Sequence, residues 1–297
     1  MRGNTKKRVS SQSPAQGWIA TAKFGKGGTK AQDSRFTLTV HALNPERGTD
    51  WSIPGRLELL KRALNTVGVC HEQTIYLTTA GWFGCETAEG NASNGISWFS
   101  FSKHEEDSLK KALCLIAKEL PPSTHMAIGV DRSGDANNQE LWWFQGGDSN
   151  VKAVHVRTDK PTPRAIGDFR VLAFICGAIY GFAGPALDFR SDLNGVDVVL
   201  NAGHASLNRQ RNPRIRLDQK RWAFHRSIRT IGRKCGAVFS HAHGSNYDAY
   251  VRNCDNWIVY RNKEPFRGER KGVRINNMTL PSGVDNQGLK VPNKIPA

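Results

Sequence analysis

Strand-like and helix-like patterns alternate along this chain, and the alternation limits the folds open to it. Residues 36–43 alternate apolar and polar side chains, which predicts a strand, and residues 57–67 place apolar side chains at the spacing of an amphipathic helix. A second strand pattern at 74–79 and a second helical pattern at 107–120 follow. Strands that alternate with helices are typical of layered α/β domains.

The chain continues mainly with strand patterns. Residues 126–130, 140–144 and 151–156 each predict a strand, and Gly146-Gly147-Asp148 predicts a hairpin turn between the last two. Residues 170–175 are almost wholly apolar, as expected for a strand covered on both faces. We interpret Trp142-Trp143-Phe144 as core. The remaining predicted elements are strands at 197–200, 236–240 and 257–260 and a helix at 217–234.

The chain has 297 residues, enough for one large α/β domain. We expect this domain at residues 31–275, after a flexible basic arm at 1–30 and before a loose polar tail at 276–297. No apolar run approaches the roughly 18–20 residues that cross a bilayer, so no membrane contact is expected. The basic N-terminus lacks the apolar stretch of a secretory signal.

The positive charge of this chain is unevenly distributed. The formal net charge is +16, and residues 206–234 carry ten Lys or Arg against Asp218 alone. A clustered excess of this kind fits an anionic partner, either a nucleic acid or an acidic protein, although a solvated helix face explains it as well. The candidate anion-binding residues are Arg221, Arg226, Arg229 and Arg233.

Six cysteines are scattered without any CxxC pair, which fits a reducing cytoplasm better than a disulfide framework. One of them, Cys176, directly follows the most apolar strand and precedes Gly177-Ala178. A nucleophile needs this placement, because a rigid strand fixes its direction and a tight turn exposes the sulfur to backbone N–H groups.

At this point the sequence resembles the nitrilase (carbon–nitrogen hydrolase) superfamily over roughly residues 35–266. The resemblance rests on element order and on four segments, which look like the family's opening strand and turn, its nucleophile strand, the strand after it, and a later helix-then-strand segment. These are residues 38–45, 170–176, 195–201 and 229–244. The resemblance implies a four-layer α-β-β-α sandwich and an association of copies into a homodimer or larger homo-oligomer.

The family's chemistry is cleavage of amide or nitrile bonds by a Cys thiolate, with a Glu as general base and a Lys that stabilises the tetrahedral intermediate. The resemblance places Cys176 as nucleophile, but the Glu and the Lys are absent where the family has them. The second predicted strand, at whose end the family has its Glu, ends here in Thr78-Thr79, and Glu86 lies further on as a substitute. Ala153 stands in the Lys-x-His pattern, with Lys152 beside it and Lys160 in the following loop.

Several histidines follow or end predicted strands, and we expect His155, His204, His241 and His243 to line the mouth of a binding pocket. No third ligand in a zinc pattern accompanies His241 and His243, so neither a metal nor another cofactor is expected. Two functions stay open. One is a thiol hydrolase acting on a small amide-type substrate through Cys176, Lys152 and Glu86. The other is a catalytically inactive nitrilase-like module that binds an anionic partner.

Overall fold

Two seven-stranded sheets form the centre of the molecule in this computed structural model. The structure describes residues 17–25, 37–45, 52–68, 72–86, 97–98, 102–131, 139–156, 162–175, 178–179, 193–203, 226–227, 230–231, 237–242, 249–253, 256–261, 264–265 and 273–279. The first sheet has the order β16-β1-β2-β3-β6-β7-β8 and the second the order β15-β14-β13-β12-β11-β10-β9. Each sheet contains three consecutive parallel strands, β2-β3-β6 in the first and β10-β11-β12 in the second.

The strands of the first sheet include most of those predicted from the first half of the sequence. Their bounds are β1 Gly17–Gly25, β2 Thr37–Pro45, β3 Gln73–Thr78, β6 Thr124–Asp131, β7 Gln139–Gln145, β8 Val151–Val156 and β16 Val273–Thr279. The predicted hairpin turn joins β7 to β8, and Gly147 adopts the positive φ of 74° that such a turn favours in glycine.

The strands of the second sheet follow in sequence. Their bounds are β9 Arg164–Ile166, β10 Phe169–Ile175, β11 Val198–Gly203, β12 Ala237–Ala242, β13 Ala249–Asn253, β14 Asn256–Arg261 and β15 Glu264–Pro265. Two short strands, β4 Cys85–Glu86 and β5 Ser97–Trp98, pair with each other outside the two sheets.

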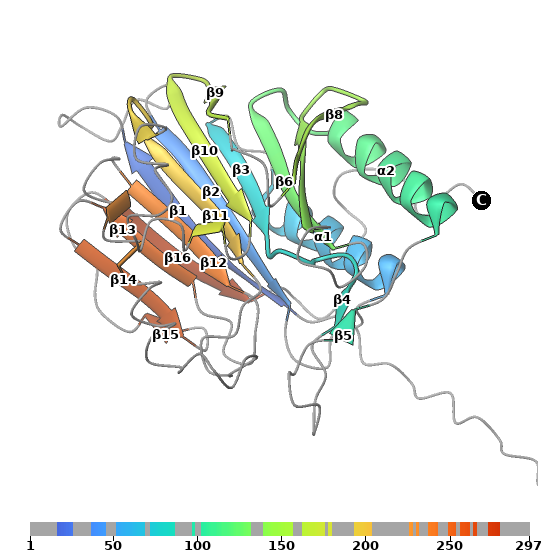
Figure 1. Ribbon diagram of the computed structural model, residues 1–297, viewed down its shortest axis with the longest axis horizontal. Helices are drawn as coiled ribbons and strands as arrows, with labels where there is room; N and C mark the ends of the chain where they lie inside the picture. Colours follow the sequence, from blue (N-terminus) through green and yellow to red (C-terminus); the bar gives the residue numbers. More distant parts are fainter. Residues whose placement is uncertain are drawn as a thin grey trace, which may run out of the picture.

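Two helices cover the outer face of the first sheet, α1 Ile53–Val67 and α2 Lys103–Lys118 (Figure 1). Each begins at a serine whose side chain accepts a backbone N–H, Ser52 for α1 and Ser102 for α2, and Glu105 completes a capping box on α2. Most apolar residues of the two helical patterns are buried and pack with Tyr76, Trp82, Phe83, Met126, Ile128, Trp142 and Phe144, but Leu115 of α2 is 37% exposed.

Strand alternation divides the side chains of the first sheet between two cores. In β3, Tyr76 points to the helices, whereas Ile75 and Leu77 point to the second sheet. The core between the sheets contains small and branched residues such as Val171, Ala173, Val198, Leu200 and Ala202. The predicted core position of Trp142-Trp143-Phe144 is confirmed, because all three are buried.

The expected sandwich has a fourth layer of helix on the second sheet, and the segment predicted as this helix lies between β11 and β12 in the chain. These strands are parallel neighbours in the second sheet. Residues 226–227 and 230–231, the described part of this connection, are helical. Ser227 and Ile231, four positions apart, are buried, while Arg226 is exposed. The described part of the predicted basic helix therefore has one buried side and one solvated side.

The chain ends differ from the expectation of a flexible arm and a loose tail. Residues 17–25 form β1, which pairs along its whole length with β2, and β16 pairs with β1 across the predicted boundary at residue 275. Burial explains the difference, because Ile19 lies in the helix-side core and Phe24 in the core between the sheets. The remaining residues of the predicted arm and tail lie outside the described residues.

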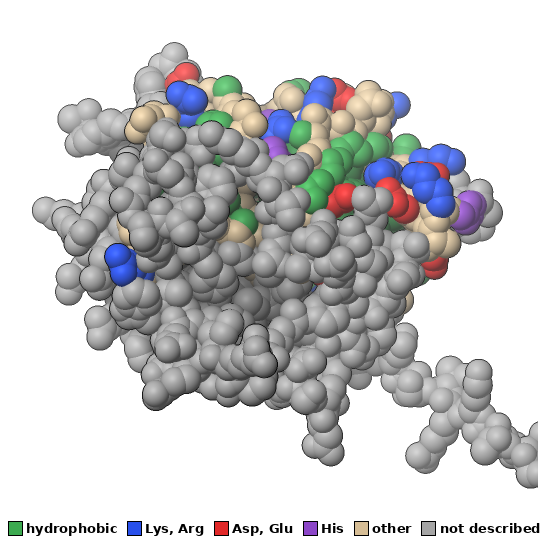
Figure 2. Space-filling view, in the orientation of Figure 1, with side chains coloured by type: hydrophobic (Ala, Val, Ile, Leu, Met, Phe, Trp, Pro, Cys, Tyr) green, Lys and Arg blue, Asp and Glu red, His purple; other side chains and the backbone are tan. Residues whose placement is uncertain are grey.

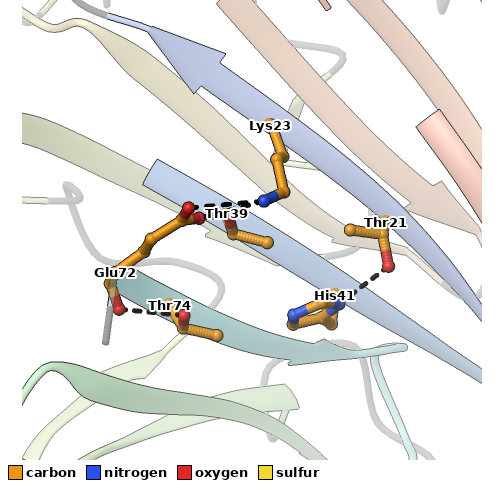
Figure 3. A network of polar contacts seen from close by, with 6 residues as sticks. All are labelled: Thr21, Lys23, Thr39, His41, Glu72 and Thr74. Carbon is orange, nitrogen blue, oxygen red and sulfur yellow. Dashed lines mark hydrogen bonds and ion pairs between the residues drawn. The ribbon is translucent and has the colours of Figure 1, made fainter. Parts of the chain in front are cut away.

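Polar side chains also hold β1 in register (Figure 3). Thr21 Oγ1 lies 2.8 Å from His41 Nδ1, and Lys23 Nζ lies 3.1 Å from Glu72 Oε2, which also accepts a hydrogen bond from Thr39. The His41 ring stacks on Tyr76. Burial, reinforced by the charge of Lys23, lowers the pKa of His41 to about 4, so this imidazole is neutral at pH 7.

Candidate functional site

The carboxyl ends of parallel strands from the two sheets meet at one end of the sandwich. The backbone N–H of Ala80, just after β3, donates to the carbonyl of Gly203, the last residue of β11, at 3.3 Å. β10 lies next to β11 with Ile175 opposite Ala202. Cys176 follows Ile175 in the chain and itself lies outside the described residues. The strand that leads to Cys176 therefore ends where both sheets converge.

The turn after β3 is fitted closely against β6. A Cβ on Gly129 would lie 2.1 Å from the Thr79 carbonyl oxygen, so glycine is required where the two backbones touch. The Gly129 N–H donates to Thr78 Oγ1 at 2.8 Å. Thr79 is buried, and its hydroxyl has no hydrogen-bond partner among the described residues.

A buried carboxylate lies two residues beyond this contact. Asp131 is the last residue of β6, and its side chain is on the same face as Ala127 and Gly129, toward the second sheet. It is fully buried, and its Oδ2 accepts a hydrogen bond from Gln139 Nε2 at 3.1 Å. Its backbone N–H donates to the Phe83 carbonyl at 2.8 Å. Asp131 was not predicted as a site residue, because a single Asp after an apolar strand is also an ordinary turn residue.

Lys152, predicted as a catalytic cation, lies on the solvated side of β8. The β7–β8 register shifts between Trp143 and Phe144, but this irregularity does not turn Lys152 inward. Its Nζ pairs with Asp148, and a hydrogen bond from Lys152 is the main reason why the pKa of that carboxyl is lowered. Ala153 packs against the core between the sheets instead.

A cationic group lies at the other edge of the interface between the sheets, where β8 faces β9. Arg164 Nε donates to His155 Nε2 at 3.3 Å, and the guanidinium lies 5.4 Å from the centre of the Trp143 ring. The His125 ring packs at a tilt against the same indole. Burial and the charge of Arg164 lower the pKa of His125 to about 4, and burial lowers the pKa of Arg164. Of these residues, only His155 was predicted.

The remaining predicted site residues are only partly described. Glu86 belongs to β4 and His241 to β12, where it is paired with Ala202, but the side chains of both lie outside the described part. Arg226 is exposed. His204, His243, Lys160, Arg221, Arg229 and Arg233 lie outside the described residues.

The described residues contain neither a candidate metal-ion cluster nor a helix that could span a membrane. No group of three or more His, Cys, Asp or Glu side chains in this part of the chain could hold a metal ion. Neither is any helix there both long enough and apolar enough to span a bilayer.

Comparison with known proteins gave matches only among solved structures, since no protein-family model and no curated protein matches the sequence. A double mutant of the amidase from Nesterenkonia sp. AN1 in complex with acrylamide matches 89% of this chain and 96% of its own, with a TM-score of 0.53 and 12% identity. A single mutant of that amidase, showing Michael addition of acrylamide at the active-site cysteine, matches 78% and 89%, with a TM-score of 0.50 and 12% identity. A third structure of the amidase, described as from the nitrilase superfamily, matches 77% and 85%, with a TM-score of 0.48 and 13% identity. The chain therefore shares the fold of this amidase.

Proposed function

We propose that this protein is a thiol hydrolase that cleaves a carbon–nitrogen bond of amide type in a small molecule, with Cys176 as its nucleophile. The observation that carries the proposal is the end of β10, which directly precedes Cys176. This strand ends where β3 and β11 converge between the two sheets. The amidase with this fold, whose active-site cysteine reacts with acrylamide, supports the same chemistry.

The proposed reaction has two steps. The Cys176 sulfur attacks the amide carbon, the C–N bond breaks, and the amine leaves as a thioester forms. Water then attacks the thioester, the C–S bond breaks, and the acid and the free thiol result. Backbone N–H groups near the end of β10 are the expected donors to the oxyanion, and one such donor contributes about 10²–10³ in rate.

A second function is favoured by a specific departure from the family pattern. Thr79 and Ala153 lie where a Glu and a Lys are expected, and Lys152 is paired with Asp148 at the surface. Loss of a general base alone costs about 10²–10⁴ in rate. A protein without either group would keep the fold and act as a binding module, with the basic stretch around Arg226 as the surface for an anionic partner.

One set of measurements separates the two functions. Hydrolysis of a panel of short aliphatic and aromatic amides is followed by ammonia or amine release for wild type, Cys176→Ala and Cys176→Ser. The hydrolase proposal expects release by wild type and none above background for both variants. Equal release by all three removes Cys176 from the mechanism.

The binding module is tested in parallel with a labelled single-stranded oligonucleotide at increasing salt. Phosphate contacts make affinity fall steeply with ionic strength, and Arg226→Glu should weaken binding further. Absence of binding at low salt contradicts the nucleic-acid version of this function.

A further inference from the structure

An arginine at the edge of the interface between the sheets has no acidic partner in the described part of the chain. We propose that Arg164 and His125, which both pack against the Trp143 ring, bind the carboxylate group of a small molecule. This site goes beyond the proposed function, because no step of the reaction at Cys176 involves it. Its residues belong to β6, β7, β8 and β9.

The strands that carry the site lie together at one edge of the sandwich. β6, β7 and β8 are consecutive in the first sheet and β8 is its last strand, while β9 is the last strand of the second sheet. The hydrogen bond of 3.3 Å from Arg164 Nε to His155 Nε2 joins these two edge strands. Arg164 and His155 are both half-buried, so solvent reaches the interface at this edge.

Two contacts fix the guanidinium of Arg164 and leave donors for a ligand. The indole of Trp143 lies against one flat face of the group, with 5.4 Å between the guanidinium carbon and the ring centre. His155 takes the hydrogen bond from Nε. The terminal nitrogens carry the other N–H donors, and two parallel N–H bonds from a guanidinium match the two oxygens of a carboxylate.

No carboxylate of the described residues balances the charge of this arginine. Burial lowers the pKa of Arg164, and no described carboxylate opposes that effect. Burial and the charge of Arg164 lower the pKa of His125 to about 4, again without an opposing carboxylate in this part of the chain. Charges inside proteins are normally paired, and a bound carboxylate would supply the missing partner.

His125 supplies a second donor beside the guanidinium. Its ring packs at a tilt against the Trp143 ring, with the two centres 6.2 Å apart. The residue is only 7% exposed, and its Nδ1 is buried without a hydrogen-bond partner among the described residues. A neutral imidazole carries its proton on either nitrogen, so Nδ1–H can donate to a carboxylate oxygen. A ligand would thus satisfy a buried polar atom that otherwise has no partner.

The charge of the site favours a carboxylate over a phosphate. Arg164 contributes a single positive charge. His125 is neutral at pH 7 because its pKa is lowered to about 4, and His155 is neutral because the nitrogen that accepts from Arg164 carries no proton. A carboxylate balances this charge, whereas a phosphate group carries about −1.5 to −2 at pH 7 and would bring an excess of negative charge into the interface.

The test measures acetate binding at pH 7 and constant ionic strength. The protein is labelled with ¹⁵N in its nine histidines, and the ring signals of His125 are assigned by their absence from His125→Phe. Wild type should show a saturable shift of the His125 signals with acetate. Arg164→Gln should weaken acetate binding about tenfold or more, because it removes the charged donors of the site.

Arg170→Gln is the matched control for the loss of charge. Arg170 is exposed on β10, opposite Ala165 of β9, and its change should leave acetate binding within about twofold of wild type, since solvent and salt screen an exposed charge. Arg164→Lys covers the case that Arg164→Gln does not fold. It keeps the charge but loses the planar set of donors, so it should weaken acetate binding about threefold or more.

The inference is overturned if the His125 shift rises linearly with acetate instead of saturating. It is also overturned if Arg164→Gln or Arg164→Lys binds acetate as tightly as wild type. Tighter binding of inorganic phosphate than of acetate would overturn the assignment to a carboxylate. Since amide hydrolysis is not part of this test, each of these results leaves the proposed role of Cys176 intact.

Discussion

Two charged side chains lie in the interface between the sheets, and they differ in the sign of their charge and in the residues that hold them in place. At the carboxyl ends of the strands, Asp131 is fully buried and its orientation is fixed by the neutral amide of Gln139. At the β8–β9 edge, Arg164 is only half-buried and is held by His155 and the Trp143 ring. Asp131 lies at the end of a strand, where backbones make close contacts. Arg164 lies at the edge of a sheet, where it is held by the packing of side chains.

This difference indicates where chemistry is possible. Regular backbone pairing stops where a strand ends, and side chains from several strand ends can then point toward the same region. Binding and catalytic residues in layered α/β folds commonly lie in the loops that follow strands. We interpret the contact of the Arg164 guanidinium with the Trp143 ring as structural, because a guanidinium stacked on an indole is stable even when it is partly hydrated. The outer surface of α2 differs from both, since charges of both signs, such as Lys103 and Asp107, lie side by side there (Figure 2).

The largest effect is expected at the carboxyl end, from Gly129→Ala. The new Cβ would lie 2.1 Å from the Thr79 carbonyl oxygen, so the β3 turn must move. We expect a loss of about 3 kcal/mol or more in the free energy of unfolding, as for severe overpacking, measured by urea denaturation. Gly68→Ala is the control, because among the described residues, its chain neighbours aside, no atom lies within 4 Å of its Cβ position. Its positive φ of 73° opposes the change at about 1 kcal/mol. Equal losses for the two variants would contradict the close fit at Gly129.

At the cationic edge we expect a pH effect on stability. The pKa of His125 is lowered to about 4 in the folded state, so between pH 6.5 and 4 the unfolded chain binds a proton that the folded chain does not. Stability is therefore complete above pH 6.5 and falls as the pH is lowered toward 4, by about 1.4 kcal/mol per pH unit for each such histidine. His41 contributes in the same direction.

His125→Phe isolates this contribution from that of His41. The variant should reduce the slope of unfolding free energy against pH to about half, measured by denaturation between pH 4 and 7. His104→Gln, on the exposed side of α2, serves as the control. An unaltered slope in His125→Phe would show that His125 is not held neutral at this edge.

The smallest effect is expected from Lys152→Ala, outside both groups. Lys152 is exposed and its partner Asp148 is half-buried, and surface ion pairs contribute about 0–1 kcal/mol. We expect less than about a threefold change in the rate of amide hydrolysis, since the ammonium group lies away from the interface. A loss of about 10²–10³ in this rate, the value of one oxyanion donor, would restore Lys152 as the catalytic cation.

Much of the fold could be predicted from the sequence, because periodicity records which face of an element is buried. The apolar stripe of 57–67 and the apolar run 170–175 correspond to α1 and β10, and both bury the predicted residues. β1 was missed because its composition resembles that of a basic arm. Its strand conformation depends on pairing with β2 and β16, a long-range contact that no local pattern records.

A candidate site residue could be predicted from the sequence only where its position directly after a predicted strand was enough to single it out. Cys176 follows from its place after an apolar strand. Asp131 and Arg164 could not be predicted, because their importance depends on which strands of the two sheets face each other. The available signal for Asp131 was its position directly after the apolar run 126–130, and only the bond to Gln139 distinguishes it from a turn residue.

The central claim is that Cys176 is an activated thiol at the end of β10, and its relative reactivity tests this most directly. Native protein is treated briefly with substoichiometric acrylamide at pH 7, and the adduct is located among the six cysteines by peptide mass spectrometry. The account predicts that Cys176 carries nearly all of the adduct, whereas Cys114, whose thiol pKa is raised by burial, stays unmodified. Equal modification of several cysteines, or an unmodified Cys176, would contradict it.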